Sequence, residues 1–233
     1  MTAPPRAALL LRAADPVPWD PADFAAALAL LPPAMHGEVQ DLRRWQDRQA
    51  RILGRLLLRA GLAHLGLDAS LDAWTRDAAG RPRLAGLAAD FNISHCAGLA
   101  LCAIRPAGRV GVDVEPLALR DPEGLRLGFG PEEWAEIQTA ADPNRTLLRL
   151  WTAKEAALKA DGRGLGVEPA TVDARGAEIR VGGTAWRVAR PDVGAGWICA
   201  LAADGPVDVK LLDASLDGLL NTTCARNPGS ACG

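Results

Sequence analysis

Residues 109–116 read Arg-Val-Gly-Val-Asp-Val-Glu-Pro, and this stretch decides how the rest of the chain is interpreted. Successive side chains of a strand point to opposite faces, so the alternation of valine with acidic residues predicts a strand buried on one side. Asp113 and Glu115 then share the other face, about 6.6 Å apart along the chain. Two carboxylates at this spacing can bind one Mg²⁺ ion, which prefers oxygen ligands. The same pattern also occurs on solvated strands, so it does not decide the function alone.

The segments on either side of this stretch predict helices beside short strands. We expect strands near 8–12, 71–75, 99–105, 109–115, 170–174, 177–181, 185–189 and 197–203, with residues 91–95 leading into the strand at 99–105, and helices near 20–31, 37–61, 131–140 and 145–160. Gly61 is expected to cap the long helix at its C-terminal end. This mixture of elements predicts an α+β fold.

The chain divides at a predicted turn near 106–109 into two units of similar size. We expect residues 1–109 to form the first half, residues 110–220 the second half, and residues 221–233 a disordered tail. The first half has a net charge of +3, and residues 110–233 have a net charge of −5. This split suits an anionic ligand held by the first half and a cation held by the second, whereas a nucleic-acid-binding protein would show a strong basic excess.

The composition excludes several classes of protein. No run of about 18 apolar residues is present, which argues against a membrane span. The N-terminal stretch does not fit a secretory signal, so we expect a cytoplasmic location. Five cysteines without a Cys-x-x-Cys pair are expected to be reduced thiols, and only three histidines are available for a zinc site, which is therefore not expected.

The use of lysine is unusual. Arginine outnumbers lysine 23 to 3, and Lys154 and Lys159 lie five residues apart. Where arginine is the default cation, this pair indicates a need for a compact ammonium. Trp151, Glu155 and Leu158 share one helix face, and Lys159 lies one turn beyond Glu155. An ordinary surface Glu–Lys pair has the same spacing, so the function of this helix stays open.

Five motifs together resemble one protein family. They are Gly80-Arg81-Pro82, Phe91-Asn92-Ile93-Ser94-His95, Gly111-Val112-Asp113-Val114-Glu115, Trp151-Thr152-Ala153-Lys154-Glu155-Ala156-Ala157-Leu158-Lys159 and Gly162-Arg163-Gly164-Leu165. In this order and spacing the set is similar to the larger, single-chain 4′-phosphopantetheinyl transferases, over about residues 40–170. The resemblance implies a pseudo-dimer of two similar α+β halves with the active site in the cleft between them.

The resemblance also implies an activity. Such an enzyme transfers the 4′-phosphopantetheine arm of coenzyme A to a serine of an apo acyl or peptidyl carrier protein and releases adenosine 3′,5′-bisphosphate. It implies Mg²⁺ as cofactor, coenzyme A as co-substrate and a cytoplasmic monomer that acts on neither nucleic acid nor membrane. Whether the carrier serves fatty-acid, polyketide or non-ribosomal peptide synthesis stays open.

The resemblance assigns roles to particular residues. Asp113, Glu115 and Glu155 match the metal carboxylates. Glu155 and Lys159 match the catalytic residues: Glu155, or a water on the metal, takes the serine proton, and Lys159 neutralises or protonates the leaving oxygens. The residues matched to coenzyme A binding are Arg51, Arg76, Arg81, Ser94, His95, Asp113 and Lys159. The basic residues expected just before the long helix are not clearly matched, since His36 and Glu38 occupy that region.

Two other functions stay open. Another Mg²⁺-dependent phosphoryl-transfer or pyrophosphate-hydrolysing enzyme would keep the carboxylates without needing Arg81, Ser94 and His95 as a phosphate-binding group. A non-catalytic relative that only binds carrier proteins would be expected to have lost a carboxylate or Lys159, and this chain has lost none.

Overall fold

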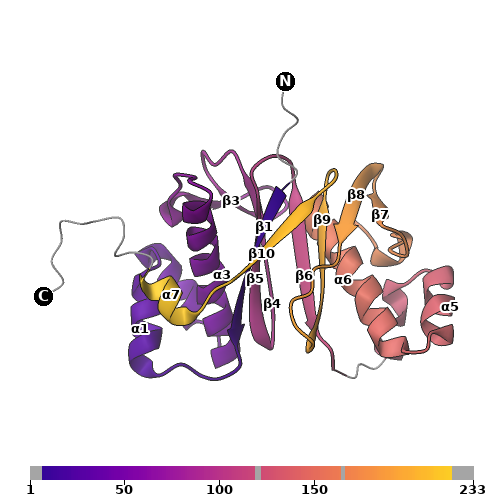
Figure 1. The fold of residues 1–233 in the computed structure, drawn as a ribbon, viewed down its shortest axis with the longest axis horizontal. Helices are drawn as coiled ribbons and strands as arrows, with labels where there is room; N and C mark the ends of the chain where they lie inside the picture. The colour runs from indigo at the N-terminus through magenta and orange to yellow at the C-terminus, as the bar shows by residue number, and fades with distance from the viewer. Residues whose placement is uncertain (1–6, 119–121, 164–165, 222–233) are drawn as a thin grey trace, which may run out of the picture.

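The computed structural model describes residues 7–118, 122–163 and 166–221. Within these ranges the predicted α+β class is confirmed, with two four-stranded sheets side by side and helices on their outer faces (Figure 1). The first sheet has the strand order β10-β1-β5-β4, and the second has the order β6-β9-β8-β7. Searching the described residues finds no helix with the length and hydropathy of a membrane span.

The elements have the following bounds. The strands are β1 (Ala7–Asp15), β2 (Trp74–Arg76), β3 (Pro82–Leu84), β4 (Asp90–Cys96), β5 (Gly98–Arg105), β6 (Val110–Pro116), β7 (Glu178–Val181), β8 (Thr184–Ala189), β9 (Trp197–Ala203) and β10 (Asp208–Asp213). The helices are α1 (Pro21–Ala29), α2 (His36–Gln40), α3 (Trp45–His64), α4 (Pro122–Leu125), α5 (Pro131–Thr139), α6 (Pro143–Asp161) and α7 (Leu216–Asn221), and short 3₁₀ turns include η2 (Leu71–Ala73) and η5 (Pro169–Thr171).

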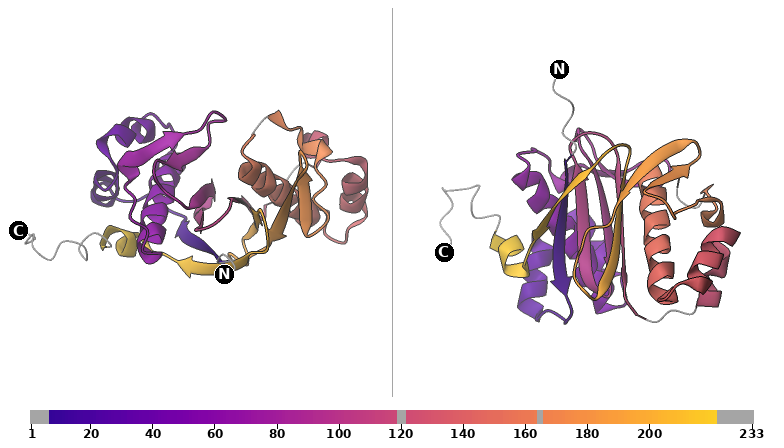
Figure 2. Two further views of the ribbon diagram at one scale, coloured as in Figure 1. Left: turned by 90° about the horizontal axis from the view of Figure 1, so that it is seen from above. Right: turned by 45° about the vertical axis from the view of Figure 1, so that its right-hand side comes forward.

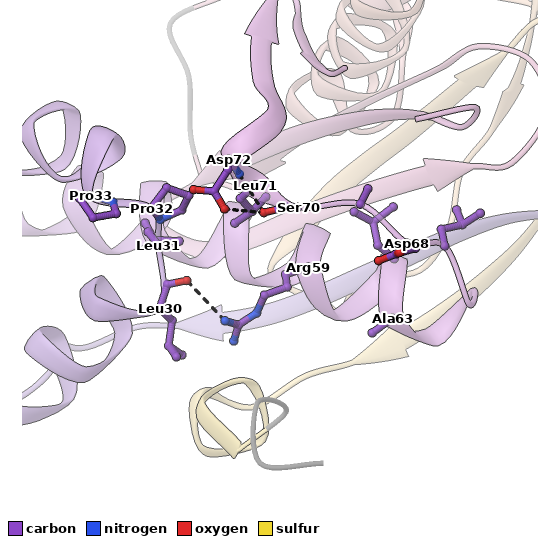
Figure 3. A pocket seen from close by; sticks show the side chains of 13 residues that line it. Leu30, Leu31, Pro32, Pro33, Arg59, Ala63, Asp68, Ser70, Leu71 and Asp72 are labelled. Carbon is purple, nitrogen blue, oxygen red and sulfur yellow. Dashed lines mark hydrogen bonds between the residues drawn. The ribbon is translucent and has the colours of Figure 1, made fainter. Parts of the chain in front are cut away.

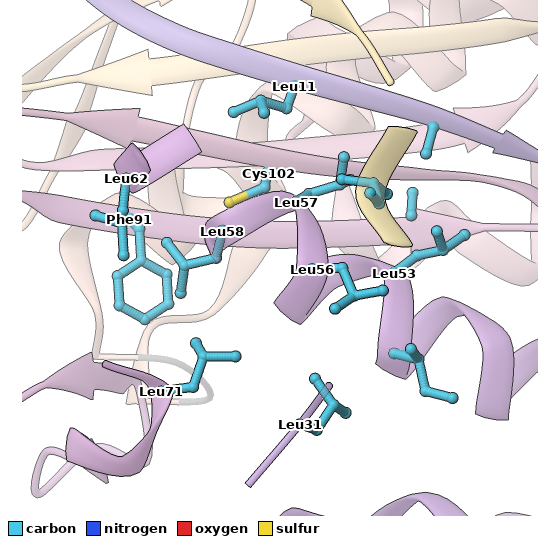
Figure 4. Close-up of a cluster of buried hydrophobic side chains, with 14 of the residues drawn as sticks. Leu11, Leu31, Leu53, Leu56, Leu57, Leu58, Leu62, Leu71, Phe91 and Cys102 are labelled. Carbon is cyan, nitrogen blue, oxygen red and sulfur yellow. The ribbon is translucent and has the colours of Figure 1, made fainter. Parts of the chain in front are cut away.

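Each sheet has one long helix on its outer face. The apolar side of α3 packs on the first sheet, where Leu53 and Leu57 meet residues of β1 and β5 such as Leu11 and Cys102 (Figure 4). The apolar side of α6 packs in the same way on β6 and β9. The inner faces of the two sheets meet in a third core formed by alternate residues of β1, β5, β6 and β9. Period-two patterning of the strands therefore supplies two separate buried surfaces.

The two sheets meet where β4 and β6 lie side by side. Side chains replace backbone pairing here, because Asp90 accepts a hydrogen bond from the Val110 N–H (2.8 Å) and Asn92 accepts one from the Val112 N–H (2.9 Å). Both acceptors are buried. We call this contact between β4 and β6 the seam.

The expected helix over 37–61 is wrong in its boundaries. The chain forms α2, leaves the helix at residues 41–44 and then forms α3. The break lets α2 fold back on α3, so that Val39 is buried and Glu38 reaches Arg55 at 2.6 Å. Gly61 does not cap the helix but lies inside α3, where any Cβ would overlap side chains of β1 and β5. Close packing of α3 on the sheet explains this glycine.

Other expectations differ from the structure in smaller ways. The strand predicted near 170–174 is the 3₁₀ turn η5, and the one predicted at 71–75 is divided between η2 and β2. The last helix, α7, includes Asn221, where the predicted tail begins; residues 222–233 lie outside the described residues, as do Gly164 and Leu165 of the last motif. Neither β10 nor α7 was predicted.

The chain returns to the first half at its C-terminal end. β10 pairs in parallel with β1, from Ala7 opposite Asp208 to Arg12 opposite Asp213. The view from above in Figure 2 shows β10 running from the second half back to the first. α7 then packs near α3, and Arg59 donates hydrogen bonds to the carbonyl groups of Leu219 (3.1 Å) and Leu30 (3.4 Å), the latter drawn in Figure 3. The first sheet is therefore completed by the last described strand.

Gly111→Ala tests the contact between β6 and α6. A Cβ at Gly111 would overlap the backbone of Ala156 and Ala160, so the helix must move away from the strand. We expect a loss of about 1–3 kcal/mol of unfolding free energy, as for overpacked cores. Urea denaturation followed by circular dichroism measures it. Gly196→Ala is the matched control, because no atom lies within 4 Å of its Cβ position; equal stability of both variants would contradict the close contact.

Candidate active site

Side chains from three elements meet beside the seam. Lys159 of α6 donates a hydrogen bond from Nζ to Asp113 Oδ1 of β6 at 2.6 Å, and its Nζ lies 3.2 Å from Ser94 Oγ of β4. Ser94 Oγ in turn donates to Asp113 Oδ1 at 3.1 Å. The strand alternation explains the geometry, since Val112 and Val114 enter the core between the sheets while Asp113 faces α6. The structure thus brings together three of the predicted site residues.

Asp113 has an unused oxygen. The side chain is buried, and Oδ2 has no hydrogen-bond partner among the described residues. Glu155 lies close by: burial raises the pKa of Glu155, the Lys159 cation lowers it and the Asp113 carboxylate raises it further. A buried carboxylate oxygen without a partner, next to a second carboxylate, is costly unless a cation neutralises it.

This arrangement fits a hard divalent cation. Glu115, half-buried, lies two residues beyond Asp113 on the same strand. Across the described ranges, however, no three His, Cys, Asp or Glu side chains already form a group that could hold a metal ion. A shared metal site of Asp113, Glu115 and Glu155 therefore stays a prediction, which the free Asp113 oxygen supports.

A cavity of about 670 Å³ opens beside this group. Its walls include Glu155 and Lys159 of α6, Asn92 of β4, the Gly80-Arg81-Pro82 turn and the segment 166–169. Residues of both predicted halves therefore line one hollow. Another cavity, of about 500 Å³, lies near the C-terminal end of α3 between residues 30–33 and 67–72, and it contains none of the predicted site residues (Figure 3).

Arg81 occupies a different position from the one expected. Its guanidinium is buried and pairs with Asp90 at 2.7 Å. The same group donates to the carbonyl oxygens of Phe91 (3.1 Å), Val110 (2.6 Å) and Lys159. Arg81 therefore joins β4, β6 and the end of α6, and its donors point at protein acceptors. This burial is not evident from the sequence, and contact between Arg81 and a coenzyme A phosphate stays a prediction.

Arg51 and Lys159 both lie close enough to His95 to act on its charge. The His95 side chain is exposed, and its pKa is lowered by partial desolvation and by the Arg51 and Lys159 cations, while Asp47 acts in the opposite direction. Arg51 is one-third exposed and has a long ion pair with Glu38 at 3.8 Å. Two cations therefore lie near His95, each with a carboxylate partner, Glu38 for Arg51 and Asp113 for Lys159.

The remaining basic positions are already engaged or lie elsewhere. Arg76, which is exposed, donates to the Gly80 carbonyl across the β2–β3 turn. In the region before α3, His36 Nε2 lies 3.0 Å from the Leu31 carbonyl oxygen, and Glu38 pairs with Arg55.

Lys154 has a role that its sequence position did not reveal. It is fully buried, pairs with Glu133 of α5 at 2.5 Å and donates to the carbonyl groups of Pro169 (2.8 Å) and Val172. Glu133 also accepts hydrogen bonds from the Gly130 and Ala174 N–H groups. This buried pair fixes the segment that forms one wall of the larger cavity. The scarcity of lysine did point to the position, as a compact ammonium fits where a guanidinium would not.

Comparison with known proteins points in one direction. A model of the 4′-phosphopantetheinyl transferase superfamily matches residues 109–199, which include Asp113, Glu115, Glu155 and Lys159. The chain is 33% identical over 129 residues to the 4′-phosphopantetheinyl transferase HetI of Nostoc sp., a match that covers 52% of this chain and 54% of that protein. It is 27% identical over 124 residues to the 4′-phosphopantetheinyl transferase Sfp of Bacillus subtilis, covering 52% and 55%.

These matches confirm the resemblance drawn from the motifs. The chain spans about half the length of the curated relatives that it matches. Among solved structures, the holo-[acyl-carrier-protein] synthase of Thermotoga maritima aligns at 19% identity and a TM-score of 0.33, covering 41% of this chain and 61% of that one. That score is too low to show a shared fold.

Lys154→Met tests the buried ion pair. Removing the ammonium leaves the Glu133 carboxylate buried without its cation, so we expect a loss of about 3–5 kcal/mol of unfolding free energy. Urea denaturation measures it. The double variant Lys154→Met/Glu133→Gln removes both charges and should recover part of the loss; a double variant less stable than Lys154→Met alone would show that the charge pair is not the cause.

Proposed function

We propose that the chain transfers the 4′-phosphopantetheine arm of coenzyme A to a serine of an apo acyl or peptidyl carrier protein and releases adenosine 3′,5′-bisphosphate. The observation that carries the proposal is the Asp113–Lys159–Ser94 group beside a cavity of about 670 Å³, within the range of small-molecule sites. The superfamily match over residues 109–199 and the names of the relatives support it.

The described side chains fit the charge changes of such a transfer. Phosphoryl transfer needs mainly positioning of the groups and neutralisation of charge. Lys159 places an ammonium at the cavity wall, where it can neutralise the oxygens of a leaving phosphate. Ser94 holds Lys159 and Asp113 in one orientation through its hydroxyl group.

The carboxylates complete the proposed site. Asp113, Glu115 and Glu155 would hold Mg²⁺, which supplies charge stabilisation at the pyrophosphate of coenzyme A. Glu155, with its raised pKa, is also suited to accept a proton from the attacking serine. Which of these two roles Glu155 plays depends on whether it coordinates the metal.

The division into two halves, the location and the oligomeric state belong to the same proposal. We propose that the two sheets, each with a long helix of 20 or 19 residues on its outer face, form the halves of a pseudo-dimer. The protein would act as a cytoplasmic monomer on carriers of fatty-acid, polyketide or non-ribosomal peptide synthesis. The superfamily match and the relatives' names give no support to the alternative of another phosphoryl-transfer or pyrophosphate-hydrolysing enzyme.

The positions of the cations also suggest how coenzyme A is held. Arg51 is one-third exposed and lies, like Lys159, near the exposed His95, and this group of donors suits the 3′-phosphate of the nucleotide. Arg81 instead acts through the protein: its guanidinium holds the Lys159 carbonyl group and the first residue of β6 in place. We therefore assign the phosphate contact to Arg51 and His95 in preference to Arg81.

Asp113→Ala tests the proposed activity. The variant loses the unpartnered carboxylate oxygen and the partner of Lys159, so transfer should fall at least about a hundredfold. The measurement is intact mass of a panel of apo-carriers incubated with coenzyme A and Mg²⁺. Asp68→Ala, an exposed carboxylate outside the site, is the control. If folded Asp113→Ala keeps more than about one-tenth of the wild-type rate, the activation free energy has risen by less than about 1.4 kcal/mol. That increase is too small for the loss of a metal ligand.

A paired comparison of Arg51→Ala and Arg81→Ala tests the phosphate assignment. Calorimetry measures binding of coenzyme A and of 3′-dephospho-coenzyme A to each variant. Arg51→Ala should weaken coenzyme A about tenfold or more and the dephospho form little, because a charge-assisted contact contributes about 1.5–3 kcal/mol. Arg81→Ala should weaken both ligands equally and lower stability, since it breaks a buried ion pair. The reverse pattern would return the phosphate to Arg81.

A further inference from the structure

A pocket of about 510 Å³ lies away from the candidate active site, between the start of α6 and the beginning of β9. Arg145 and Arg149 of α6 form one wall, and the β8–β9 loop, residues 190–195, forms another. Trp197 and its neighbours on β9 complete the lining. None of the residues predicted to bind coenzyme A or metal lines it, so this pocket is separate from the proposed site.

The pocket has an excess of positive charge. Arg149 pairs with Glu136 of α5, but the guanidinium groups of Arg145 and Arg190 form no ion pair or hydrogen bond with any part of the chain that the structure describes. Asp192 is the only acid among the lining residues, and its Oδ1 already accepts the Gly194 N–H at 2.9 Å. Partial burial lowers the pKa of Arg190, and the nearby Arg149 cation lowers it further. The lining therefore carries three guanidinium groups and one carboxylate, and Glu136 outside the lining neutralises only Arg149.

The wall that carries Arg190 is held in one conformation. Val193 is buried in the core between the sheets, and Arg12 of β1 donates a hydrogen bond to its carbonyl group at 2.5 Å. The Gly196 carbonyl accepts from the Leu117 N–H at 2.8 Å, and the Trp197 N–H lies 3.2 Å from the Gly194 carbonyl oxygen. The loop is thus anchored to β1 and to the end of β6. A preorganised wall loses little conformational entropy when a ligand binds.

We propose that this pocket binds a small polyanion through Arg145, Arg149 and Arg190. The guanidinium fork matches phosphate and carboxylate oxygens, and two of these three forks are free of protein partners. Trp197 and Pro191 supply an apolar surface for the rest of the ligand. The volume lies within the range of small-molecule sites, which favours a compact phosphorylated or polycarboxylated molecule over the flat face of a protein. The proposal does not depend on the transferase activity.

The test is calorimetric titration of protein freed of metal ions on a chelating resin, at low ionic strength, with two probes, inorganic pyrophosphate and citrate, which distinguish phosphate from carboxylate ligands. The variant is Arg145→Ala/Arg190→Ala. Its matched control is Arg180→Ala/Arg187→Ala, which removes two positive charges from β7 and β8 at residues paired with Glu178. Thermal melting checks that both remain folded, and the single variant Arg190→Gln replaces the double variant if that one unfolds.

We expect the wild-type protein to bind at least one probe at a saturable site. The affinity for that probe should fall about tenfold or more in the pocket variant and stay unchanged in the control. If the probes bind in the larger cavity instead, binding would persist unchanged in both variants, and the proposal would be overturned. Equal weakening in both would show a general effect of net charge and overturn the proposal. Absence of saturable binding in the wild type would overturn it too, as would a hexaglutamate peptide that binds in an Arg145- and Arg190-dependent way while neither probe does.

Discussion

The seam between β4 and β6 is the constraint on which the site depends. Backbone groups of neighbouring strands normally pair with each other, but here the side chains of Asp90 and Asn92 accept the N–H groups of β6. Asp90 has a second task, because its carboxylate also pairs with the buried Arg81. One side chain thus fixes the distance between the sheets and the orientation of the guanidinium that reaches α6. Ser94 and Asp113 face each other across this junction only because the register of β4 and β6 is set two residues earlier.

The two lysines of α6 have different roles. Lys159 faces the cavity with a carboxylate and a hydroxyl group around it, and Lys154 is enclosed with Glu133 beneath the Phe129 ring, 5.4 Å from its centroid. Both positions would accept a cation, but a buried guanidinium at 154 would need more acceptors than the carbonyl groups of η5 and one carboxylate provide. The composition thus carried structural information as well as chemical information: one lysine supports the wall of the cavity, and the other projects into it.

The sequence patterns predicted the structural features that depend on residues close together in the chain. The alternation at 109–116 and the amphipathic helix around Glu155 were both predicted correctly, because each depends on neighbours within a few residues. Contacts between distant segments were not predicted: Arg81 binds a carbonyl 78 residues away, and β1 pairs with a strand about 200 residues later. The break before α3 was missed for the same reason, since it serves the packing of Val39 and Glu38 on a helix that begins later. The site carboxylates could be predicted from the sequence, but the Asp113 carboxylate oxygen that has no hydrogen-bond partner among the described residues is seen only in the structure.

The pairing of β1 with β10 bears on how the protein is made. During synthesis the N-terminal sheet can form between β1, β5 and β4 while the strand that covers the other side of β1 has not yet been translated. A nascent chain would then present an open strand edge, the kind of surface through which chains associate wrongly. Closing that edge requires a loop of nearly the whole polypeptide, a slow event of high contact order. Late arrival of β10 therefore leaves the half-finished chain with one edge of β1 that only the completed chain can cover.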